Sequence, residues 1–183
     1  MIYHFSLQIV ALVAGAILLL IGLLGVSSPA VLQGQAKQFP RSKIAGIVLL
    51  TIALAWTVWL LSTMEMGEFA TFRKPLLIIL PIGFFLVLRF VDEFLAVRAL
   101  GILCLLAAEP LLDAAFFRDD PARLVVTVFA YVLILIGMFW VTMPYLLRNQ
   151  IDWSARSNGR WRAVFGFILL YGAAMVVLAF TMY

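Results

Sequence analysis

Long apolar stretches run along the whole chain, and short segments that hold most of the polar and charged residues separate them. Hydrocarbon offers the backbone no water to bond, so a stretch of about 20 apolar residues closes its hydrogen bonds within a spanning helix. Breaks in the pattern predict six spans, at Phe5–Val26, Ile44–Leu61, Pro75–Phe90, Phe94–Leu112, Leu124–Leu147 and Ala163–Met182. We therefore expect an all-α, polytopic transmembrane bundle of three hairpins, forming a single membrane domain over residues 1–183.

The third predicted span is the shortest. It holds about 16 residues, with Pro81 and Gly83 inside it, which is less than a spanning helix usually needs. An alternative is that spans three and four form a re-entrant hairpin that dips into the membrane from the outer face. The charged turn between them would then lie near the midplane, where charges mark ion or substrate paths. Both interpretations stay open.

The first and last hairpins share a sequence pattern. Leu18–Gln35 aligns without a gap with Leu133–Gln150, and 8 of the 18 positions are identical. Leucine matches arise easily in such a chain, but the glycine and proline matches are harder to obtain by chance: Gly22/Gly137 and Pro29/Pro144. We interpret the hairpins at about 5–61 and 124–182 as a parallel internal repeat that flanks a divergent middle hairpin at 75–112.

The proline of each copy predicts a change of direction at the end of a span. Proline suits the first turn of a helix, where its missing N–H has no partner in any case. A short amphipathic helix should therefore begin at each proline and lie in the membrane interface. Its neighbourhood carries residues that we expect among the headgroups: Lys37, Arg148, Trp153 and Trp161.

Composition and charge agree with this interpretation. The chain is 66% hydrophobic and 12% charged, with a mean hydropathy of +1.14, far from the composition of soluble domains. The segments after odd-numbered spans hold nine of the 13 Lys and Arg residues, which predicts that they face the cytoplasm and that both termini face outward. The net charge of +4 mostly reflects this asymmetry, so we expect the lipid bilayer as a partner and no nucleic acid.

Glycines recur in corresponding positions of the spans. A missing side chain lets two helices approach closely in lipid, and we interpret five glycines as helix-packing residues. They are Gly22, Gly46, Gly101, Gly137 and Gly166.

Two polar clusters are the candidates for chemistry. Glu109 and Asp113 are four residues apart near the outer end of span four, so a continuing helix places both carboxylates on one face, although Pro110 between them favours a bend. Such a pair binds cations, carries protons or serves in acid and base catalysis, or it is simply the wet end of a helix. The second cluster lies around the turn between spans three and four, where it is either an ordinary charged turn or a buried site: Arg89, Asp92, Glu93 and Arg98.

Other chemistry finds little support. The chain has one histidine, His4, and one cysteine, Cys104, which excludes the multi-ligand sites of zinc or haem. No phosphate loop, HExxH or GxSxG motif is present. We therefore expect no catalytic residue, cofactor or metal.

Three functions fit these features, in this order. The first is a non-catalytic accessory, assembly or scaffold subunit of a larger membrane complex, partnered by other membrane subunits or by further copies of itself. The second is a small solute or ion permease or channel, and the third is a lipid-modifying membrane enzyme. In each case we expect a multi-pass protein of a cell membrane, the cytoplasmic or inner membrane of a prokaryote.

Overall fold

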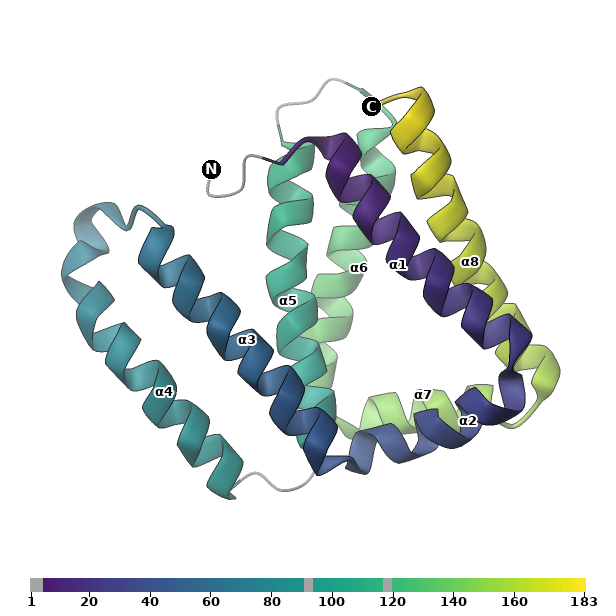
Figure 1. Ribbon diagram of the computed structural model, residues 1–183, viewed down its shortest axis with the longest axis horizontal. Coiled ribbons are helices and arrows are strands. Elements are labelled where there is room, and N and C mark those ends of the chain that lie inside the picture. Colours follow the sequence, from purple (N-terminus) through teal and green to yellow (C-terminus); the bar gives the residue numbers. More distant parts are fainter. Residues whose placement is uncertain (1–4, 91–93, 117–119) are drawn as a thin grey trace.

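The computed structural model describes residues 5–90, 94–116 and 120–183, which form helices joined by short turns (Figure 1). Six helices in these ranges are long and apolar enough to cross a membrane, counting η2 and α4 as one, and the same ranges hold no strand. The protein is thus an all-helical, multi-pass membrane protein, as predicted. The elements in chain order are α1 (Leu7–Ser27), α2 (Pro29–Gln38), η1 (Phe39–Arg41), α3 (Lys43–Thr63), η2 (Gly67–Phe72), α4 (Arg73–Phe90), α5 (Leu95–Ala115), α6 (Arg123–Thr142), α7 (Tyr145–Ser154) and α8 (Asn158–Thr181).

Serine side chains start two of the long helices. The Ser6 hydroxyl accepts a hydrogen bond from the Ile9 amide at 3.3 Å, and the Ser42 hydroxyl accepts one from the Ala45 amide at 3.2 Å. Each serine satisfies an amide that has no partner inside its own helix, which fixes where α1 and α3 begin.

The two predicted interfacial segments are short helices of ten residues each, α2 and α7. Pro29 occupies the first turn of α2, and Pro144 directly precedes α7. The predicted end of the fifth span at Leu147 is wrong, because α6 ends at Thr142 and Leu147 belongs to α7. The physical reason is Pro144, whose ring disfavours helical geometry at the residue before it.

The third span is longer than the apolar pattern indicates, since η2 and α4 together cover 24 residues. Its short apolar stretch is therefore no argument for a re-entrant hairpin. The start of α5 also lies beside the start of α3, where a Cβ added to Gly46 would be 2.9 Å from the Ala96 amide nitrogen. Helix α5 thus begins level with the end of the bundle and not halfway along it.

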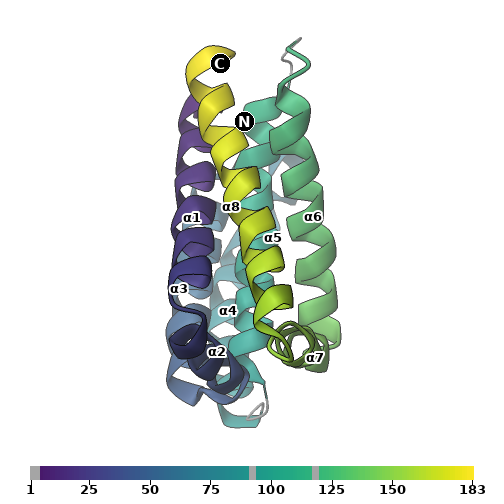
Figure 2. The ribbon, with the colours of Figure 1, turned by 90° about the vertical axis from the view of Figure 1, so that its right-hand side faces the viewer.

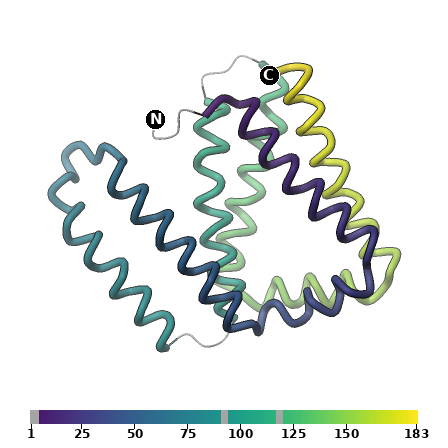
Figure 3. Tube along the Cα trace, in the orientation of Figure 1, coloured from purple at the N-terminus to yellow at the C-terminus, as the bar shows by residue number. Residues whose placement is uncertain are grey.

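The closest helix pairs do not follow the predicted first and third hairpins. Helix α1 packs against α8, α5 against α6, and α3 against α5, as the tube trace also shows (Figure 3). Within each of those two hairpins a ten-residue helix separates the spans, and such a helix is about 15 Å long. That length exceeds the 8–10 Å at which two helices pack, so α1 and α6 must find partners elsewhere.

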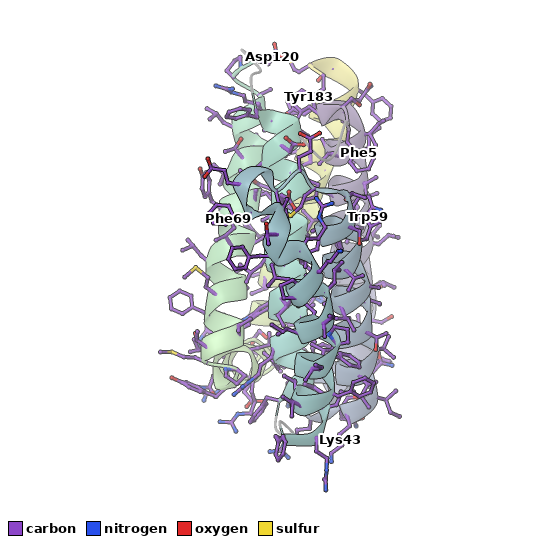
Figure 4. The ribbon with its side chains drawn as sticks, turned by 90° about the vertical axis from the view of Figure 1, so that its left-hand side faces the viewer. Phe5, Lys43, Trp59, Phe69, Asp120 and Tyr183 are labelled. Carbon is purple, nitrogen blue, oxygen red and sulfur yellow. The ribbon has the colours of Figure 1, made fainter. Side chains whose placement is uncertain are left out.

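The two pairs α1–α8 and α5–α6 converge at one end of the bundle and diverge toward the other (Figure 1). The convergent end is the one near Asp120 and Tyr183, opposite to Lys43 (Figure 4). A buried cluster dominated by small side chains fills it, drawn from all four helices: Leu7, Ala11, Ala108, Leu111, Ala114, Ala115, Val126, Ala130, Met175 and Ala179. At the divergent end α2 and α7 lie side by side and bridge the pairs (Figure 2).

Trp161 is buried, although we predicted that it lies among the headgroups. Only 2% of its surface is exposed, its Nε1–H donates to the Gly25 carbonyl at 3.0 Å, and its ring lies 4.6 Å from that of Phe165. Trp153 in α7, by contrast, is 51% exposed. Trp161 therefore joins α8 to α1 instead of anchoring the chain in lipid.

Candidate functional site

Glu109 and Asp113 lie on the same helix, as the spacing predicted. Helix α5 continues through Pro110 to Ala115, so the two carboxylates are one turn apart. Both line one cavity of about 540 Å³ at the convergent end of the bundle. The rest of the lining is apolar and comes from α5, from the following Phe116 and from α6: Leu105, Ala108, Leu112, Phe116 and Ile134.

The two carboxylates differ in exposure and in bonding. Glu109 is exposed, whereas Asp113 is half-buried and its Oδ2 is buried without a hydrogen-bond partner. Arg123, the first residue of α6, directs its guanidinium to the Ala115 carbonyl at 3.5 Å. An unpaired carboxylate oxygen favours binding of a cation, because burial without a partner is costly. The described residues nevertheless bring together no group of three His, Cys, Asp or Glu side chains that could hold a metal.

The second predicted cluster is divided between two helices. Arg89 is exposed in the last turn of α4, and Arg98 is half-buried in the first turn of α5. Asp92 and Glu93 lie outside the described residues, so the predicted pairing of Arg89 with Glu93 has no structural description. Arg98 has a buried Nε without a hydrogen-bond partner.

Four of the five glycines singled out in the sequence stand where helices meet. A Cβ added to Gly22 would lie 2.7 Å from the Leu169 backbone, and Gly101 and Gly137 would each meet the other's carbonyl within 3 Å. Gly46 stands against the start of α5. Gly166 differs, because no described residue lies within 4 Å of a Cβ added there, so it makes no close approach to the described part of the chain.

A second, wholly apolar cavity of about 630 Å³ lies where α1, α5 and α6 diverge. Its lining includes Ile9, Ile17, Pro110 and Phe129, with Trp56 contributed by α3. Nothing in the sequence pattern predicted it. The cavity depends on the angle between the α1–α8 and α5–α6 pairs. In the sequence, its lining residues cannot be distinguished from side chains that face the membrane.

The fold defines the class of this protein, a multi-pass helical membrane protein with two acidic side chains at the convergent end of its bundle. Neither the protein-family models nor the curated proteins compared with the sequence match this chain, and no solved structure matches its fold.

Proposed function

We propose that this protein is a non-catalytic accessory or assembly subunit, which uses the hairpin of α3 and α4 to bind a transmembrane helix of another subunit. The observation that carries the proposal is that α4 has no buried residue, although it is as long as a spanning helix. Helix α4 packs mainly on α3 and η2, and it lies on the outer side of α3, away from α1, α6 and α8 (Figure 1).

The face of α4 carries the feature that another helix would use. Gly83 has nothing within 4 Å of an added Cβ, so its backbone is open to close approach. In lipid, helices associate through such small residues, because packing against a flat backbone replaces the hydrophobic drive that acts in water. Large apolar side chains flank this position and remain more than half exposed: Ile79, Ile82, Phe85 and Leu86.

The test is co-purification of the tagged full chain in mild detergent, followed by identification of the membrane proteins that elute with it. The informative variant is Gly83→Leu, which fills the open position on α4. Gly166→Leu is the matched control, because Gly166 is equally open but lies on α8. We expect Gly83→Leu to release the partner and Gly166→Leu to retain it.

Two outcomes would contradict this proposal. One is that the protein elutes as a lone protomer under every mild condition. The other is that both variants keep the same partner, which would place the contact elsewhere on the chain. A third outcome is that the protein elutes as an oligomer of this chain alone and that Gly83→Leu breaks the oligomer. The partner of α4 would then be a second copy of this chain and not another subunit.

A specific observation also favours a second function, a small cation permease. Glu109 and Asp113 line one cavity, and Asp113 carries an unpaired buried oxygen. Cation flux into proteoliposomes should then fall with Glu109→Gln and with Asp113→Asn. Absence of flux in the wild type, or flux that neither variant changes, would exclude a permease that uses Glu109 and Asp113. The accessory function would then be the one proposal that remains.

The orientation and the repeat belong to the same proposal. We infer that both termini face outward and that α1–α2–α3 and α6–α7–α8 descend from one duplicated unit, supported by the ten-residue helix in each. In a Cys104→Ser background, an impermeant thiol reagent should label Glu68→Cys in intact cells. It should label Ser157→Cys only after the membrane is opened.

A further inference from the structure

Two arginines flank one phenylalanine where α5 and α7 begin. Arg98 lies in the first turn of α5, and its amide donates to the Phe94 carbonyl at 3.2 Å. Arg148 lies in the first turn of α7, with its Cζ 5.8 Å from the centre of the Phe94 ring. Both residues therefore lie near Phe94 at the divergent end of the bundle, and we call the three the arginine corner: Phe94, Arg98 and Arg148.

Neither guanidinium forms an ion pair with a described carboxylate. Nε of Arg98 is buried and has no hydrogen-bond partner, and Arg148 donates only a weak bond of 3.4 Å to the Asn149 side chain. A half-buried guanidinium without an anion is costly, because burial removes water from the charge and no opposite charge replaces it. The corner thus favours a bound anion.

The backbone at Phe94 supports a built site. Its φ of 56° lies in the left-handed region, which a bulky side chain rarely adopts. Such strain persists where surrounding structure imposes it, often at binding sites. Phe94 precedes the first residue of α5, and its ring lies beside the Arg148 guanidinium.

The location of the corner identifies the anion. It lies at the end of the spans beside α7, where the headgroups of a bilayer meet a multi-pass protein. We propose that the arginine corner binds the phosphate of an anionic phospholipid. Guanidinium groups suit phosphate because their donors are arranged in a fixed fork, and the bilayer presents phosphates at this level. This proposal rests on the membrane-spanning fold and is independent of the proposed subunit function.

The test is native mass spectrometry of the detergent-solubilised full chain, titrated with phosphatidylglycerol or with phosphatidylcholine of the same acyl chains. The informative variant is Arg98→Gln/Arg148→Gln. Its control, Lys37→Gln/Arg156→Gln, removes the same charge from α2 and from the segment after α7. We expect the corner variant to bind phosphatidylglycerol roughly tenfold or more weakly, since each cation contributes about 1 kcal/mol, and the control to bind within about twofold of the wild type.

Each other outcome decides against the proposal. Equal losses in both double variants would show diffuse attraction to the charged surface. Unchanged binding in the corner variant would show that these two arginines do not carry the lipid binding. If millimolar inorganic phosphate displaces bound phosphatidylglycerol as effectively as added lipid does, the corner binds a free anion and not a lipid. Circular dichroism checks folding, and Arg148→Gln alone serves if the double variant does not fold, with a loss of at least threefold expected.

Discussion

Helices α1 and α8 form the tightest pair in the bundle, whereas α3 and α4, which are neighbours in the chain, pack loosely. Both pairs are antiparallel and strongly apolar. In α1–α8, glycines let the backbones touch, and a Cβ added to Gly172 would lie 2.8 Å from the Leu19 amide nitrogen. In α4 the one glycine faces open space and no residue is buried. Apolarity thus brings a helix into lipid, but small residues in register decide which helix it packs against.

The same comparison separates packing from connectivity. Helices α3 and α4 are joined by the short segment around η2 and still make few contacts, while α1 and α8 come from opposite ends of the chain. The α1–α8 pair also has a polar link, from Trp161 to the Gly25 carbonyl. Four changes test this contrast.

Trp161→Ala should have the largest effect. It removes a buried ring and the hydrogen bond to Gly25, and we expect the free energy of unfolding to fall by about 3–5 kcal/mol. Unfolding in mixed detergent, followed by circular dichroism, measures it. Trp153→Ala is the control, because that ring is half exposed, and a similar loss there would contradict the assigned role of Trp161.

Gly22→Ala should come next. The new Cβ would lie 2.7 Å from the Leu169 backbone, which cannot rotate away, so α1 and α8 must separate. We expect a loss of about 1–3 kcal/mol in the same unfolding measurement. A stability equal to that of the wild type would show that α1 and α8 do not meet at this point.

Tyr183→Phe should have a smaller, pH-dependent effect. The Tyr183 hydroxyl donates to the Ala122 carbonyl, a bond that contributes about 1 kcal/mol. Burial, and then the charges of Asp120 and Tyr171, raise the pKa of Tyr183. The folded state therefore favours the neutral phenol.

That stabilisation is complete below the ordinary tyrosine pKa of 10.0 and is lost as the pH rises through the raised value. Unfolding measured from pH 8 to 11 should show a weaker alkaline loss in Tyr183→Phe than in the wild type. Identical curves would contradict the assignment.

Gly83→Ala should have the smallest effect and the opposite sign. Open space surrounds Gly83, so alanine gains helix propensity without a clash, worth up to about 1 kcal/mol. It is also the matched control for Gly22→Ala. If Gly83→Ala destabilised the isolated protein, α4 would be packed in solution in a way that the structure does not contain.

Much of this architecture can be predicted from the sequence. The apolar pattern located all six spans, and prolines located the two short helices, because both signals are local consequences of backbone chemistry in lipid. The spacing of Glu109 and Asp113 predicted their shared face, since helical periodicity alone decides it. The end of the fifth span was misplaced at Leu147 because the apolar pattern continues across Pro144, and the third span was predicted too short because that pattern does not include η2.

What the sequence by itself determined is therefore the membrane class, the spans and the face shared by the acidic pair. Only the tertiary structure decided that α1 packs on α8, that Gly166 faces open space while Gly22 does not, and that the Phe94 ring lies beside Arg148. The physical reason is that lipid satisfies every apolar face equally. The choice among partners then depends on how closely two backbones fit, and that fit exists only once helices far apart in the chain have met.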